Sequence, residues 1–184
     1  MKWTLVAACM LAAAPASAQD QAGADDILSR IINVPAPSAY RVDGLREKPK
    51  VRKDETVQGG KAIRIFVPGK SPQAWSVSAS NPIEKPVRAG DLLVLAFWAR
   101  LEKGEDGAAT ASLPNNVVQL AKEPYTALFA GPVTLTPEWK LHEVKGKADK
   151  DYAAGELNVA LHLATAKQTI DLGPIFVLNM GPAK

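Results

Sequence analysis

The 184-residue sequence has few of the groups that metal proteins and thiol enzymes use. It contains one cysteine, Cys9, and two histidines, His142 and His162. A single cysteine cannot form an intrachain disulfide. Neither histidine has further ligands at metal-binding spacing, so the pattern does not predict a zinc site. We therefore expect no bound metal and no cofactor.

Catalytic motifs are missing as well. The chain has no Gly-x-Ser-x-Gly elbow, no Gly-rich phosphate loop and no His-Glu-x-x-His pair. Hydrolysis of a glycoside needs two carboxylates that flank a cleft. The acidic residues here, such as Glu105, Asp106 and Asp149, fall mostly in expected loops. The sequence therefore predicts a protein that is not an enzyme and has no catalytic residues.

Long apolar runs and strong charge are also lacking. After the first residues there is no run of about 18 apolar positions, so we expect no membrane span. The chain has 22 Lys and Arg against 19 Asp and Glu, a formal charge of +3. The basic residues form no recognised cluster, and we expect no nucleic-acid partner.

Residues 1–18 have the pattern of a secretory signal peptide. Lys2 precedes an apolar run at 3–14, and Ala16-Ser17-Ala18 provides a small-x-small cleavage site. Cleavage there would remove Cys9 and Lys2, which would change the formal charge from +3 to +2. We expect a periplasmic or secreted protein whose mature chain begins at about Gln19.

The remaining sequence predicts one short helix followed only by strands and turns. The helix is expected at Ile27–Ile32, with an aspartate as its cap and prolines after its end. Strands are expected at 51–57, 61–68, 74–80, 87–101, 110–113, 117–121, 125–129, 133–135, 139–144, 157–163 and 169–178. About ten short strands at this spacing predict an all-β fold, an antiparallel β-sandwich of the jelly-roll type. We divide the chain into a signal peptide at 1–18, a helix and extended segment at 19–49, and the sandwich at 50–184.

The strand expected at 87–101 is apolar on both of its faces. Leu93, Leu95 and Phe97 share one side, which we assign to the core. The opposite side carries Trp98 and then Arg100, which suits either a second packing layer or a binding groove.

Five short motifs, taken in this order, resemble a known family of binding modules. They are Trp75 in a Ser-rich strand, PVRAGD at 86–91, LAFWAR at 95–100, LTPEWK at 135–140 and IDLGP at 170–174. Over residues 50–179 the chain resembles the carbohydrate-binding modules of families 4, 9 and 22, which are galactose-binding-like jelly rolls often attached to glycoside hydrolases. The resemblance implies an exported, non-catalytic polysaccharide-binding module, with a glycoside hydrolase or another envelope protein as a candidate partner. The alternative is an envelope protein–protein interaction domain of the same fold that binds no sugar.

A sugar-binding groove pairs aromatic platforms, which stack on the C–H faces of the rings, with planar polar groups, which bind the hydroxyls. The candidate platforms are Trp75, Trp98 and Tyr125, and the resemblance puts a ligand-stacking tryptophan at Trp75. The polar candidates, which strand parity turns away from the core, are Arg100, Gln119, Asn158 and His162. Two alternatives stay open: Trp75 could pack inside, and Trp98 could belong to a second packing layer. The resemblance also leads us to expect Trp139 in the core.

Overall fold

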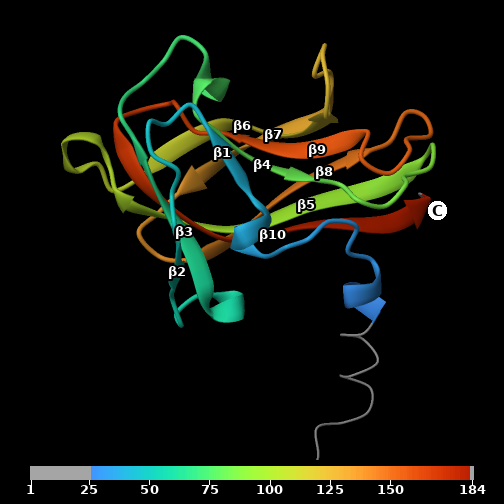
Figure 1. The fold of residues 1–184 in the computed structure, drawn as a ribbon, viewed down its shortest axis with the longest axis horizontal. Coiled ribbons are helices and arrows are strands. Elements are labelled where there is room, and N and C mark those ends of the chain that lie inside the picture. The colour runs from blue at the N-terminus through green and yellow to red at the C-terminus, as the bar shows by residue number, and fades with distance from the viewer. Residues whose placement is uncertain (1–25, 183–184) are drawn as a thin grey trace, which may run out of the picture.

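The computed structural model describes residues 26–182, which form two antiparallel β-sheets packed face to face (Figure 1). The sheet that we call the front sheet lies uppermost in Figure 1, above the one that we call the back sheet. The front sheet has the strand order β1 (Arg41–Asp43), β4 (Ser78–Pro82), β9 (Leu157–His162), β6 (Ala111–Leu120) and β7 (Ala127–Leu135). The back sheet has the order β2 (Val51–Lys53), β3 (Lys61–Val67), β10 (Gln168–Pro182), β5 (Asp91–Lys103) and β8 (Lys140–Lys147). Within residues 26–182, three 3-10 turns connect strands, namely η2 (Gln58–Gly60), η3 (Ala74–Ser76) and η4 (Glu105–Gly107), and a fourth, η1 (Pro37–Ala39), precedes β1. The expected all-β sandwich, consistent with a jelly roll, is thus confirmed.

The core lies between the sheets and follows the alternation of the sequence. In β9, Leu157, Val159 and Leu161 point inward and are buried. In β5 the inward side, which includes Leu95 and Phe97, is fully buried as expected. Because successive strand residues face opposite ways, the polar residues between them face outward. Strand parity therefore decides which side chains reach the outer face of each sheet.

Two pairs of short expected strands turn out to be continuous. β6 covers most of 110–113 and of 117–121, and β7 covers most of 125–129 together with 133–135. The β6–β7 register shifts between Leu113 and Asn116, where Pro114 removes a backbone donor. The Asn116 amide donates to the carbonyl oxygens of Leu113 and Gly131, both at 3.0 Å. This bulge lets the strand continue through residues that predict a turn.

The segment before β1 is less helical and more closely joined to the sandwich than expected. Only residues 26–29 form a helical turn, and Ile27 and Leu28 are exposed. From there the backbone pairs with the free edge of β10: the Ile32 N–H donates to the Val177 carbonyl at 2.9 Å. The C-terminal half of β10 pairs with β5 on its other edge only, so its free edge can accept this extended segment. The expected signal peptide lies outside the described residues.

Asn33 fastens this segment to both sheets. Its side-chain amide donates to the Ile175 carbonyl of β10 at 2.8 Å and to the side-chain oxygen of Asn81 on β4 at 3.0 Å. Its own side-chain oxygen accepts from the Val177 N–H at 2.7 Å. Asn33 is buried, so these bonds satisfy a polar group that would otherwise destabilise the fold.

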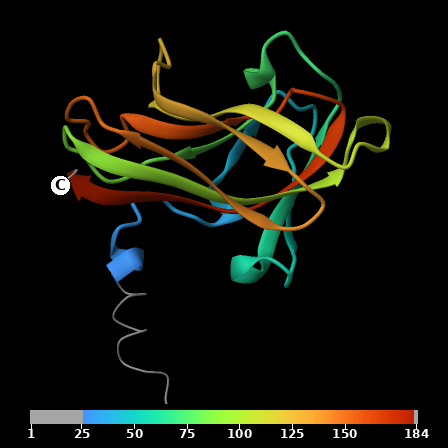
Figure 2. The same cartoon turned by 180° about the vertical axis from the view of Figure 1, so that it is seen from behind.

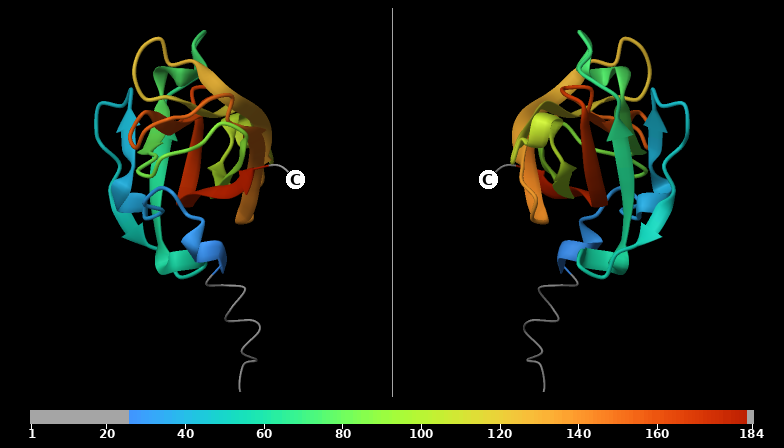
Figure 3. Two further views of the ribbon diagram at one scale, coloured as in Figure 1. Left: turned by 90° about the vertical axis from the view of Figure 1, so that its right-hand side faces the viewer. Right: turned by 90° about the vertical axis from the view of Figure 1, so that its left-hand side faces the viewer.

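On the opposite side, β7 and β8 bring the edges of the two sheets together (Figure 3). Glycine makes this close approach possible. A Cβ atom at Gly146 would lie 2.2 Å from the ring of Phe129, and one at Gly131 would lie 2.8 Å from the side chain of Val144. Both glycines therefore let side chains of the neighbouring sheet pack directly on their backbone.

No helix within residues 26–182 is both long and apolar enough to cross a bilayer.

Candidate functional site

A groove of about 1010 Å³ lies on the outer face of the front sheet. Its floor is built from short side chains on neighbouring strands. Ser80 of β4 lies opposite Ala160 of β9, and Ser78 lies opposite His162. Because serine and alanine project little from a sheet, the middle of this face is hollow while its borders are raised.

The raised borders carry Trp75 and Tyr125, which are 57% and 51% exposed. Trp75 belongs to η3, and Tyr125 lies on the loop between β6 and β7. Both segments project from the same side of the front sheet, as Figures 1 and 2 show. Two large aromatic side chains thus stand over one groove and remain largely open to water.

The exposure of Trp75 depends on η3. A strand running through 74–80 would place Trp75 on the same side as Val77 and Ala79, which are both buried. The 3-10 turn at Ala74–Ser76 interrupts that alternation before β4 begins at Ser78. The tryptophan therefore faces out, beside the serines of the floor.

Polar groups from three strands complete the groove. Gln119 of β6 and Asn158 of β9 are register partners, and His162 lies further along β9. The side-chain oxygen of Asn158 is buried and accepts no hydrogen bond from any described residue. A buried acceptor without a donor is destabilising, so this oxygen is suited to receive a donor from a bound molecule.

The charge of the groove is small. Arg41 and Asp43, at the outer border on β1, form an ion pair with a closest distance of 2.8 Å, and Glu123 lines the opposite border. Burial lowers the pKa of His162 below its usual value, so the imidazole is neutral at pH 7. The arrangement suits an uncharged ligand rich in hydroxyl groups.

Two of the seven predicted site residues lie elsewhere. Trp98 and Arg100 are on the outer face of β5, in the back sheet, and both are partly exposed. The Trp98 indole N–H donates to the side-chain oxygen of Gln58 at 2.8 Å. The two sheets turn their outer faces in opposite directions, so neither residue can contact a ligand held in the groove.

Arg100 instead belongs to a cluster around Asp171, which is fully buried. The Asp171 carboxylate accepts hydrogen bonds from Arg52 at 2.8 Å, Arg64 at 2.8 Å and Arg100 at 2.9 Å. Burial alone would raise the pKa of Asp171, but these hydrogen bonds and the arginine charges outweigh it and lower the pKa. The ionised Asp171 carboxylate is thus hydrogen-bonded to guanidinium groups. Separately, residues 26–182 contain no cluster of three or more candidate metal ligands.

The expectation that Trp139 lies in the core is wrong. Its side chain is partly exposed on the back-sheet side, its indole N–H donates to the Thr56 hydroxyl at 3.2 Å, and its ring lies 5.0 Å from the Arg100 guanidinium. The physical reason is that β8 begins at Lys140, so strand alternation does not orient Trp139. Trp98 and Trp139 together hold the segment before β3 against the back sheet.

Several groove residues were missed from the sequence. Arg41 and Asp43 lie on a strand of three residues, too short for alternation to reveal. Ser78 and Ser80 have a visible signal, since serine at every second position predicts a shallow strand face. Glu123 lies in a loop, and no sequence pattern points to it.

No family model and no curated protein sequence matches the chain. Solved structures do match it. The second N-terminal cellulose-binding domain of Cellulomonas fimi β-1,4-glucanase C has 17% identity and a TM-score of 0.59, over 84% of this chain and 95% of that one. The CBM22-1 xylan-binding domain from Paenibacillus barcinonensis Xyn10C has 15% identity and a TM-score of 0.53, over 84% of this chain and 94% of that one.

The chain has the fold of these carbohydrate-binding modules. A third match is the CBM22-1–GH10 portion of Clostridium thermocellum Xyn10B complexed with xylohexaose, at 13% identity and a TM-score of 0.54. It covers 82% of this chain but 28% of that one. The matching region is thus nearly the whole solved chain in the first two structures and part of a longer solved chain in the third.

Proposed function

We propose that this protein is an exported, non-catalytic module that binds a polysaccharide in the groove of the front sheet. The observation that carries the proposal is the pair of exposed aromatic side chains, Trp75 and Tyr125, at the borders of a single hollow. Leaving this much aromatic surface in water is unfavourable for a folded chain. Stacking on the C–H face of a sugar ring would remove it from water.

The polar groups of the groove supply the remaining recognition. The unpartnered side-chain oxygen of Asn158 accepts from a sugar hydroxyl, and Gln119 and the neutral imidazole of His162 can each donate and accept. Small-molecule sites have volumes of about 300–1000 Å³, and this groove has about 1010 Å³. Its size favours several linked sugar units over a monosaccharide.

The structural matches support a plant-type polysaccharide as the ligand, since those domains carry the names cellulose-binding and xylan-binding. The signal-peptide pattern at 1–18 supports export to the periplasm or the medium. A glycoside hydrolase is the partner we propose, because a matching domain occurs with a GH10 module in one chain.

Affinity gel electrophoresis of matched variants tests the proposal. The gels contain xylan, hydroxyethylcellulose or mixed-linkage β-glucan, and at least one of these should slow the wild-type protein. Replacing Trp75 with alanine should abolish the retardation. Loss of a central aromatic contact costs about 2 kcal/mol, which is about thirtyfold in Kd.

Phe66→Ala is the matched control, because Phe66 is an aromatic residue with 56% exposure on the outer face of β3 in the back sheet. It should keep full retardation. The proposal fails if no polysaccharide slows the wild-type protein, which would favour an envelope protein–protein interaction domain. It also fails if Phe66→Ala, and not Trp75→Ala, loses binding.

A further inference from the structure

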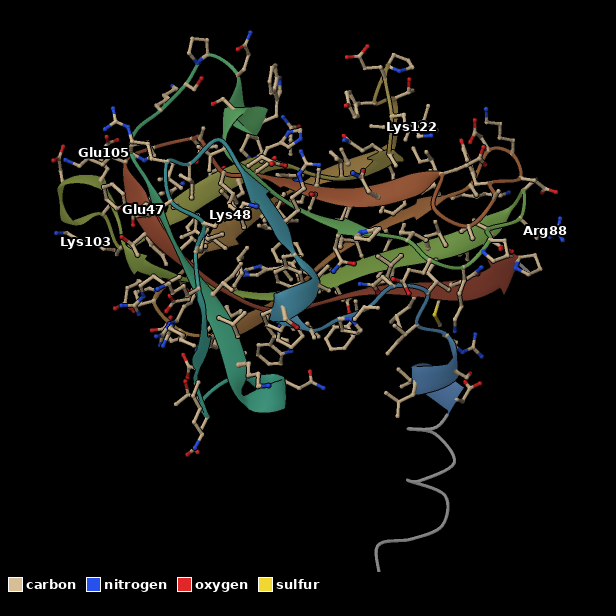
Figure 4. The ribbon with its side chains drawn as sticks, in the orientation of Figure 1. Glu47, Lys48, Arg88, Lys103, Glu105 and Lys122 are labelled. Atoms are coloured by element: carbon tan, nitrogen blue, oxygen red, sulfur yellow. The ribbon has the colours of Figure 1, made fainter. Side chains whose placement is uncertain are left out.

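A second hollow, of about 590 Å³, lies at one end of the sandwich, and we call it the end pocket. Three connections surround it: the loop after β3, the β5–β6 connection that contains η4, and the β9–β10 connection. Figure 4 labels Glu105 of η4 at this end and Arg88 at the opposite end of the molecule. No residue that lines the end pocket also lines the groove, so the end pocket is a separate space.

Gln168 lines the end pocket and is 2% exposed. Its side-chain amide donates to the Leu163 carbonyl and to the Thr165 hydroxyl oxygen, both at 3.0 Å. A carbonyl can only accept, so these contacts fix which end of the amide is nitrogen. The side-chain oxygen is buried, and no described residue donates to it. An unsatisfied acceptor of this kind is costly and points to a donor supplied from outside the protein.

The rest of the lining indicates what that donor belongs to. Small apolar residues, such as Pro72 and Ala164, alternate with hydroxyl groups of serine and threonine, and none of the lining residues is aromatic. Glu105 and Asp106 provide acceptors, and Lys70 provides a donor. Short apolar contacts interspersed with both donors and acceptors match a compact ligand in which C–H groups alternate with hydroxyls.

We propose that the end pocket is a second saccharide site, which takes a single sugar unit and receives one of its hydroxyls at the side-chain oxygen of Gln168. Its position next to the groove supports this assignment. Within η3, Ala74 lines the end pocket whereas Trp75 lines the groove. The inference goes beyond the proposed function, because a single sugar can occupy the end pocket whether or not a chain fills the groove.

Nuclear magnetic resonance of the ¹⁵N-labelled protein tests the site. D-xylose, L-arabinose, D-glucose and D-galactose are each titrated while the backbone amides of Thr165 and Ala166 and the side-chain amide of Gln168 are followed. We expect at least one of these sugars to shift all three signals with saturation. Ala108 is exposed at the rim of the end pocket, and Ala108→Phe should weaken this binding at least about tenfold.

Ala154→Phe is the matched control, since Ala154 is exposed in the loop between β8 and β9 at the opposite end, and it should leave the titration unchanged. Ser112→Phe, on an exposed position of β6 in the same lining, serves as a second blocking variant. The proposal is overturned if none of the four sugars shifts these signals, or if the shifts survive both blocking variants. A separate titration with xylohexaose and cellohexaose follows Gln119 and Asn158, so failure of the groove is distinguished from failure of the end pocket.

Discussion

Replacing Asp171 with asparagine tests whether the charged cluster on the back sheet is structural. The Asp171 side chain is fully buried and is hydrogen-bonded by Arg52, Arg64 and Arg100. Asparagine keeps the shape of the side chain but removes its negative charge. Three guanidinium groups would then converge on a neutral amide and would lose their shared counter-ion.

The expected loss of stability follows from burial. Removing one partner of a buried ion pair costs about 3–5 kcal/mol. The three arginine side chains are 22–41% exposed, so water screens part of the loss. We therefore expect about 3 kcal/mol for Asp171→Asn. Each kcal/mol shifts the melting temperature of a domain of this size by about 2–4 °C, which gives a decrease of about 6–12 °C.

The same interaction predicts a pH dependence. Because the folded protein holds the pKa of Asp171 below its unfolded value of about 3.9, its contribution is complete above about pH 4. It is lost as the pH falls through the folded-state pKa. The stability difference between wild type and Asp171→Asn should be constant from about pH 7 to about pH 5 and should shrink below about pH 4.

Thermal and urea unfolding, followed by circular dichroism, measure these effects. Asp151→Asn is the control, because Asp151 is 60% exposed and pairs with Arg88 on the surface. It should lower the melting temperature much less than Asp171→Asn does, because exposed ion pairs contribute little to stability. An unchanged melting temperature for Asp171→Asn would refute the reasoning. So would a folded Asp171→Asn protein that no longer binds polysaccharide, since that would place the binding surface on the back sheet.

Two further predictions concern the sandwich edge and the groove. Asn33→Ala should lower the free energy of unfolding in urea by about 2–3 kcal/mol, because it leaves buried backbone groups of β10 unpaired. The control Asn115→Ala, at an exposed position, should change that free energy by less than about 0.5 kcal/mol. Equal effects of the two substitutions would contradict this role of Asn33. Burial lowers the pKa of His162, and a bound polysaccharide would exclude more water and lower this pKa further. Protonation of His162 therefore opposes binding, and the affinity measured by calorimetry should fall as the pH drops from about 7.5 to about 5. His162→Gln should flatten that profile, and an unchanged slope would exclude the imidazole as its cause.

Strand alternation predicts most of the fold because it depends on local sequence. The period of two along β9 places Asn158 and His162 on an outer face, and the structure has them there. In β5 the residues on both sides of the strand are apolar. Alternation separates Trp98 from the core-facing residues, but it does not show to which sheet, and so to which outer face, Trp98 belongs. That choice depends on the strand order β2-β3-β10-β5-β8, which follows from long-range pairing.

The unpredicted parts of the candidate site depend on irregular backbone or distant contacts. A single 3-10 turn turns Trp75 outward, and the residues around it alternate as a strand would. The arginines around Asp171 come from β2, β3 and β5, and nothing in their sequence separation predicts that they meet. The end pocket combines three connections, whose relative positions are likewise a property of the whole sandwich.

The most direct test of the central claim is a map of amide shifts in the ¹⁵N-labelled protein upon titration with cellohexaose and xylohexaose. The account predicts saturable shifts for Gln119, Asn158 and His162 on the front sheet, with Trp98 and Arg100 unchanged. Shifts centred on Trp98 and Arg100, or no saturable shift with either sugar or with a longer soluble β-glucan, would contradict it.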